Sequence, residues 1–84
     1  MSYKVKIHPD VAKFLEKLPK NISKRIKNKL GEVRKNPFHY LEHYKSEDVY
    51  KLRIGDYRAL IDIDTSRKIL FVQLIDKRSR IYKK

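Results

Sequence analysis

Residues 50–61 read YKLRIGDYRALI, two alternating runs on either side of Gly55-Asp56. Alternation with a period of two is typical of β-strands, and a two-residue turn that contains glycine is typical of a tight hairpin. The turn fixes the pairing, so Ile54 should lie opposite Tyr57 and every pair behind them follows. One face of the hairpin is then apolar and suited to a core; it consists of Tyr50, Leu52, Ile54, Tyr57, Ala59 and Ile61.

The opposite face of the same hairpin is basic. It carries Lys51, and it sets Arg53 directly opposite Arg58. Two like charges facing each other across neighbouring strands repel, so folding alone gives no reason to place them there. A bound polyanion would reverse the sign of that cost. We therefore predict an exposed phosphate-binding face, and we expect removal of Arg58 to leave thermal stability unchanged or raised.

The chain before the hairpin predicts a strand and two helices. Residues 3–7 alternate as a strand does, and Pro9 stands where a first helix should begin. Asn21 is the expected cap of a second helix, which should end at Asn36-Pro37. The apolar stripes of the two helices consist of Val11, Phe14, Leu15 and Leu18, and of Ile22, Ile26, Leu30 and Val33.

The remaining segments complete the pattern. Residues 37–48 show no clean period, which predicts a loop with one helical turn. Residues 69–75 are apolar at nearly every position, as in a central strand covered on both faces, and Gln73 fits either face. The outward side of the second helix is basic, as a solvated helix face often is; it carries Lys24, Arg25, Lys27, Lys29, Arg34 and Lys35.

The order of these elements predicts a fold class. It is β-α-α-β-β-β, which we interpret as one α+β domain spanning residues 1–84. An N-terminal strand and an antiparallel helical hairpin should accompany a mainly antiparallel four-stranded sheet, with the helices packed on one face of that sheet.

Composition narrows the class of partner. Lysine and arginine total 22 against 10 acidic residues, a formal net charge of +12. Such a charge attracts polyanions and speeds their capture. The chain has no cysteine, which favours a reducing cytoplasm, and no apolar run long enough to span a membrane.

Several kinds of catalytic site are disfavoured. The sequence has no P-loop motif, no thiol and no HExxH motif. His39 and His43 stand four apart, as a metal-binding or acid–base pair on a helix would, and Asp62 and Asp64 share a strand face. No further carboxylate or histidine is fixed beside either pair, so we predict no metal and no cofactor.

Arginine, lysine and tyrosine around a phosphate remain. This set can cleave RNA without a metal, because the 2′-hydroxyl of RNA is itself the nucleophile and cations stabilise the charge of the pentavalent phosphorane. The planar guanidinium group suits phosphate oxygens better than an ammonium group does.

These residues carry a resemblance that extends over essentially the whole chain. The run at residues 50–58, the hydrophobic strand after it and the segment DKRSRIY at 76–82 resemble the RelE/ParE toxin superfamily. So do the opening strand and the helical hairpin. The resemblance implies a toxin of a toxin–antitoxin pair. In the RelE branch, such a toxin enters the ribosomal A site and cleaves the messenger RNA there.

The resemblance also implies roles for single residues. Arg58 and Arg78 match the arginines that stabilise the transition state in that family. Lys51 and Arg53 match its two basic strand residues, and Lys51 is the better candidate base because the other position holds an arginine. Tyr82 matches the C-terminal tyrosine.

Arg53 is also expected to bind RNA, and two more basic residues complete the RNA-binding set. Lys45 stands where a further phosphate contact is expected, and Arg80 belongs to the basic tail. The chain departs from the best-known RelE pattern in having only three residues between Arg78 and Tyr82.

The resemblance leaves two other functions open. One is inhibition of DNA gyrase, the activity of the ParE branch, which typically lacks this arginine, lysine and tyrosine set. The other is RNA binding without catalysis. The implied partners are the ribosome, messenger RNA and an acidic RelB-like antitoxin encoded next to the toxin.

Overall fold

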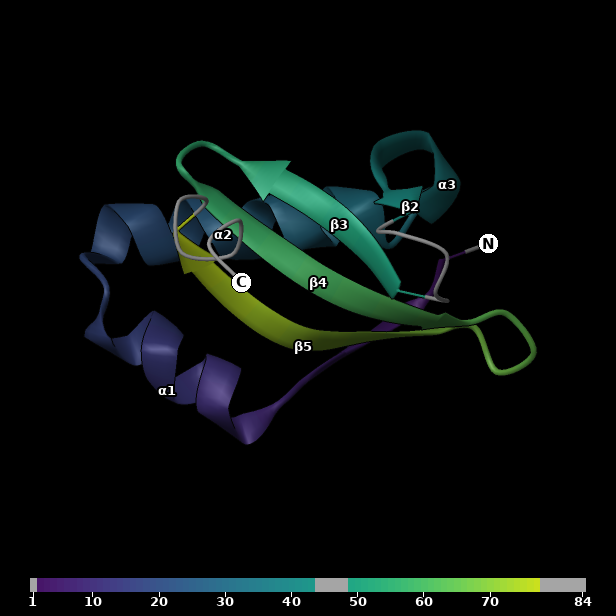
Figure 1. Ribbon diagram of the computed structural model, residues 1–84, viewed down its shortest axis with the longest axis horizontal. Helices are drawn as coiled ribbons and strands as arrows, with labels where there is room; N and C mark the ends of the chain where they lie inside the picture. Colours follow the sequence, from purple (N-terminus) through teal and green to yellow (C-terminus); the bar gives the residue numbers. More distant parts are fainter. Residues whose placement is uncertain (1, 44–48, 78–84) are drawn as a thin grey trace.

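Helices lie across one face of a five-stranded sheet, and no described helix covers the other face, which we call the open face (Figure 1). The computed structural model describes residues 2–43 and 49–77. Its elements are β1 (Lys4–Ile7), α1 (Pro9–Lys17), α2 (Lys20–Val33), α3 (Pro37–Tyr40), β2 (Glu42–His43), β3 (Val49–Ile54), β4 (Tyr57–Asp64) and β5 (Ile69–Lys77).

The sheet is mainly antiparallel, as predicted. Its strand order is β1-β5-β4-β3-β2, with β1 parallel to β5 and every other neighbouring pair antiparallel. In Figure 1, α1 and α2 run in opposite directions, which confirms the helical hairpin. The sequence predicted four strands and missed β2, because a strand of two residues is too short to show alternation.

The start of α1 is confirmed, and the predicted cap of α2 is wrong. His8 caps α1: its Nδ1 accepts a hydrogen bond of 3.0 Å from the backbone N–H of Asp10, and Pro9 opens the helix. The cap position of α2 is occupied by Pro19, with φ of −53°, and Asn21 lies inside the first turn. Because proline holds a φ close to the helical value, it ends one helix and starts the next without a spacer.

The register of the central hairpin is confirmed. Ile54 pairs with Tyr57, and Arg53 pairs with Arg58. Gly55 has a φ of +59° at the first position of the turn, a conformation that glycine adopts without steric cost.

The pairing of β5 with β4 shows on which face of the sheet Gln73 lies, which the sequence left open. Arg58 lies opposite Asp76, and the register shifts between Leu60 and Ile61, where β5 holds one extra residue. That residue is Gln73, whose Nε2 donates a hydrogen bond of 3.0 Å to Asp62 Oδ2. Gln73 is therefore the bulge residue, and its side chain lies on the open face with that of Asp62.

The core lies between the helices and the covered face of the sheet. The apolar stripes of α1 and α2 pack against alternate residues of β3, β4 and β5. Contrary to the prediction for residues 69–75, β5 is covered by helices on one face only, and Phe71 is half-buried on the other. The buried apolar side chains are Val11, Leu15, Ile26, Leu30, Val33, Leu41, Leu52, Ile54, Ala59, Ile61, Ile69, Leu70, Val72 and Ile75.

The outward face of α2 is less uniform than predicted. Lys29 is half-buried, and so is Arg34, which follows the last residue of the helix and whose Nε donates a hydrogen bond of 2.9 Å to the carbonyl of Tyr3. Lys24, Arg25 and Lys27 are exposed as expected. Among the described residues, no helix is long and apolar enough to cross a bilayer.

Candidate functional site

Three predicted site residues line one cavity. Lys51, Arg53 and Arg58 border a hollow of about 300 Å³ on the β3 side of the sheet, which we call the β3 cavity. Lys51 and Arg53 come from β3, and Arg58 comes from β4, directly opposite Arg53. Period-two alternation brings them to the same face of the hairpin, as predicted.

The two facing arginines differ sharply in exposure. Arg53 is exposed, whereas Arg58 is only 5% exposed. The prediction of an exposed face is therefore wrong for Arg58. The physical reason is that β4 is an interior strand. Arg58 is flanked by Arg53 of β3 on one side and by Asp76 of β5 on the other.

Other residues complete the β3 cavity, and sequence reasoning missed their part in it. Lys29, Tyr40 and Glu42 also line it. The Glu42 carboxylate lies 3.7 Å from Lys51 Nζ, and Lys29 Nζ lies 4.8 Å from the centre of the Tyr40 ring. Glu42 was missed because it sits on the unpredicted β2. A signal for Lys29 was present: it stands three residues after Ile26 and four before Val33, beside the buried stripe.

Lys45, Arg78, Arg80 and Tyr82 lie outside the described residues. Their predicted roles stay predictions.

The histidine alternative does not fit the structure. His39 belongs to α3 and His43 to β2, so they do not share a helix face. His43 instead stacks on the Tyr50 ring, with 4.3 Å between ring centres.

Asp62 and Asp64 both have ordinary structural partners. Asp62 accepts the hydrogen bond from Gln73, and Asp64 Oδ1 accepts one of 3.0 Å from the backbone N–H of Arg67. Within residues 2–43 and 49–77, no group of histidine and acidic side chains is arranged to hold a metal ion.

The β3 cavity suits an anion. Four of the described residues that line it are cationic, namely Lys29, Lys51, Arg53 and Arg58, and one other, Glu42, carries a carboxylate. Guanidinium groups at neighbouring positions can hold the oxygens of one phosphate, and a cation shielded from water acts on charge more strongly than an exposed one. Arg58 is the shielded cation, and Arg53 and Lys51 are more accessible.

Comparisons with known proteins agree with this fold. Residues 5–82 match the family described as the ParE toxin of the type II toxin–antitoxin system parDE. A protein of Methanocaldococcus jannaschii named as toxin RelE1 is 30% identical over 88 aligned positions, covering 99% of this chain and 98% of the relative.

Solved structures of RelE toxins are also similar to this chain. The archaeal RelE–RelB complex from Pyrococcus horikoshii contains a chain with a TM-score of 0.79 and 28% identity, covering 95% of this chain and 99% of that one. A free variant of the E. coli toxin RelE has a TM-score of 0.76 and 26% identity, with 99% and 93% covered. The chain belongs to the RelE/ParE superfamily, the toxins of type II toxin–antitoxin systems.

Proposed function

We propose that this toxin cleaves messenger RNA in the ribosomal A site and so inhibits translation in the cytoplasm. The observation that supports this most is the β3 cavity. There Lys51 and Arg58, which the RelE resemblance assigns to catalysis, lie beside Arg53, which is expected to bind RNA. The RelE names of the relatives support the same branch.

The chemistry needs only RNA and the cations. The 2′-hydroxyl attacks the adjacent phosphorus, a 2′-O–P bond forms, and the bond from phosphorus to the 5′-oxygen breaks. The products are a 2′,3′-cyclic phosphate and a 5′-hydroxyl. Arg58 stabilises the extra negative charge of the phosphorane, and Lys51 is the candidate base for the 2′-hydroxyl proton. Arg78 and Tyr82 complete the proposed catalytic set, and Arg53, Lys45 and Arg80 bind the RNA.

The decisive experiment is primer extension on messages translated with the purified toxin. We expect the wild type to produce discrete cuts and Arg58→Ala to cut roughly 100- to 1,000-fold more slowly. Arg67→Ala is the matched control, because Arg67 lies in the exposed turn after β4 with a side chain that is 78% exposed. Equal loss in both variants, or none in Arg58→Ala, would contradict the proposed role.

The nucleophile can be tested separately. We expect a 2′-deoxy nucleotide at the cut site to abolish cleavage of a short RNA at high toxin concentration, while EDTA leaves the rate unchanged. The ribosome-free substrate matters because ribosomes themselves need magnesium. Cleavage of the 2′-deoxy substrate, or dependence on an added metal ion, would rule out this mechanism.

A second function is favoured by one observation, the match to the family described as ParE. Inhibition of DNA gyrase would then be the toxic activity. A gyrase supercoiling assay with the same protein separates the two, since a messenger nuclease should leave supercoiling unaffected.

The proposed protein partner is an acidic, RelB-like antitoxin encoded next to the toxin. The net charge of +12 supports it, as do solved complexes of related RelE chains with RelB. Expression of the toxin alone should arrest bacterial growth, and co-expression with the neighbouring frame should restore it. Harmless expression of the folded chain would count against a toxin.

A further inference from the structure

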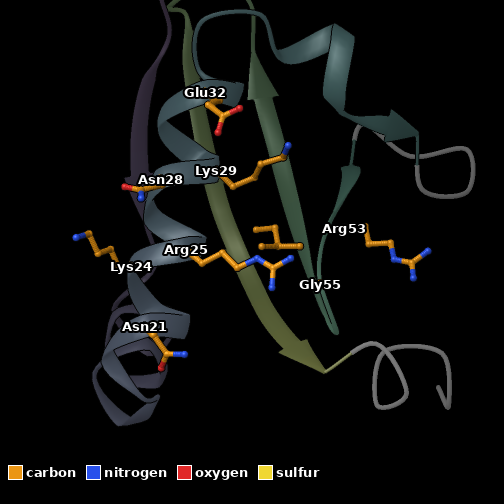
Figure 2. A pocket seen from close by; sticks show the side chains of 9 residues that line it. Asn21, Lys24, Arg25, Asn28, Lys29, Glu32, Arg53 and Gly55 are labelled. Atoms are coloured by element: carbon orange, nitrogen blue, oxygen red, sulfur yellow. The ribbon is translucent and has the colours of Figure 1, made fainter.

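A second, larger hollow lies next to the β3 cavity. It has a volume of about 550 Å³ and runs between α2 and the turn that joins β3 to β4; we call it the α2 groove. Figure 2 shows Arg25 and Lys29 reaching from α2 toward β3 and the turn, with Glu32 at one end of the row. These three residues follow one another at intervals of four and three, which places them on one side of the helix.

Arg25 lies beside the hairpin turn. Its guanidinium atoms are 3.4 to 3.6 Å from the position that a Cβ atom on Gly55 would take. The guanidinium therefore faces Gly55, which has no side chain. Within the described part of the chain, no carboxylate forms an ion pair with Arg25 or Lys29. Their charges remain available to an anion from outside.

The α2 groove and the β3 cavity are neighbours, because Lys29 and Arg53 line both of them. In Figure 2 the Arg53 side chain points away from α2, whereas Lys29 reaches toward the sheet. Lys29 is therefore the cation that a chain with one phosphate in the β3 cavity would pass on its way to the groove. No aromatic ring lines the groove among the described residues. Such a surface binds a phosphate backbone and does not stack bases.

The lining favours RNA over an acidic peptide. Peptide segments usually dock through apolar anchors that fill pockets in the partner. Ile54 is the one apolar side chain among the described residues that line the groove. Point cations without apolar pockets match the repeating charges of a nucleic acid backbone better.

We propose that the α2 groove binds the sugar–phosphate backbone of the substrate RNA beside the cleavage point, independently of base sequence. This inference rests on the proposed function for the identity of the strand. Arg25 is the central contact, because it lines the groove and does not line the β3 cavity.

The test measures binding of the full chain to ribosome-free RNA. Fluorescence anisotropy is recorded with labelled single strands of oligo-U and oligo-A that carry 2′-methoxy groups and so cannot be cut. The variant is Arg25→Gln. Its matched control is Lys13→Gln, which removes one positive charge from an exposed position of α1, away from the groove. Thermal melts confirm that both variants fold.

We expect Arg25→Gln to weaken binding of both strands equally, by about fivefold at 0.1 M salt. The slope of log K against log salt should fall by about 0.7, the value for one phosphate contact on a single strand. Lys13→Gln should change affinity by less than about twofold, since its charge acts only at long range. In the translation assay, Arg25→Gln should raise KM more than it lowers kcat.

Three results would overturn the inference. The first is an equal effect of Arg25→Gln and Lys13→Gln on RNA binding. The second is a loss of antitoxin binding with RNA affinity unchanged, which would assign the groove to a peptide. The third is a loss seen with ribosomes but not with free strands, which would assign it to ribosomal RNA. The wild type could also bind RNA with the expected dependence on Arg25 and yet cut no message. That result would contradict the proposed cleavage and support RNA binding by the α2 groove.

Discussion

The two faces of the β3–β4 hairpin follow different rules. On the covered face, Leu52, Ala59 and Ile61 are between 0 and 2% exposed, as their alternation predicts. On the open face, Arg53 is exposed while Arg58, directly opposite, is 5% exposed. Alternation therefore identifies the face on which a side chain lies, but the burial of that side chain depends on what the neighbouring strands place around it.

The difference arises from position within the sheet. From Tyr57 to Asp62, β4 lies between β3 and β5, so a long side chain in this part of β4 is flanked on both sides. Among the described residues, β3 is paired on its outer side only with the two residues of β2, which lie opposite Tyr50 and Lys51. Arg53 lies beyond that pairing and stays in solvent.

The largest expected effect on stability lies on the covered face. Ile61→Ala removes a side chain that is 0% exposed and should cost about 2–5 kcal/mol in the free energy of unfolding. Leu60→Ala is its matched partner, because Leu60 is the preceding residue, half-buried on the open face. It should cost about 1–2 kcal/mol, in line with its smaller buried area. Urea unfolding of both variants tests this.

Equal costs for Ile61→Ala and Leu60→Ala would mean that the open face is packed as closely as the covered one. The contrast between the two faces would then be confined to the arginines. A larger cost for Leu60→Ala would contradict the assignment of the core.

A smaller effect should distinguish the two arginines. From the repulsion argument alone, Arg58→Ala should leave stability unchanged or raised. Because Arg58 is buried and opposite Asp76, we now expect a loss of about 1–3 kcal/mol, from lost packing of its stem and from the loss of a cation opposite Asp76. Arg53→Ala should change stability by less than about 0.5 kcal/mol, as exposed substitutions usually do. Thermal melts at equal salt measure both.

An Arg58→Ala variant as stable as wild type would restore the repulsion argument. It would show that the cost of facing Arg53 offsets the gain from burial. Higher salt should then stabilise the wild type relative to the variant, because screening weakens the repulsion between the two guanidinium groups.

Most of the fold follows from local patterns, and the missing parts have physical causes. The β3–β4 register was predictable because a two-residue turn allows only one pairing of the flanking strands. The strand at residues 69–75 was predictable from its apolar run. β2 is too short to show a period, and the register of β5 depends on a bulge at Gln73 that no local pattern announces.

The candidate site was only half predictable for a similar reason. Lys51, Arg53 and Arg58 come together through the hairpin alone, so the sequence was sufficient. Lys29, Tyr40 and Glu42 reach the β3 cavity through the packing of α2, α3 and β2 against the edge of the sheet. Contacts between segments far apart in the chain are invisible to an argument from periodicity.

The smallest expected effect concerns the rim of the site. Glu42 is the only carboxylate among the described residues of the β3 cavity, and its oxygen lies 3.7 Å from Lys51 Nζ. Since the Glu42 side chain is 75% exposed, Glu42→Gln should change stability by less than about 1 kcal/mol. RNA must compete with that carboxylate for Lys51, so the variant should bind RNA about two- to fivefold more tightly at low salt. The gain should shrink as salt screens the charges.

Glu16→Gln on the exposed side of α1 is the matched control, because it makes the same change in net charge away from both hollows. Anisotropy with the uncleavable strands measures the difference. An equal gain in the control would mean that overall charge governs RNA binding, and that the open face has no local advantage over the rest of the basic surface.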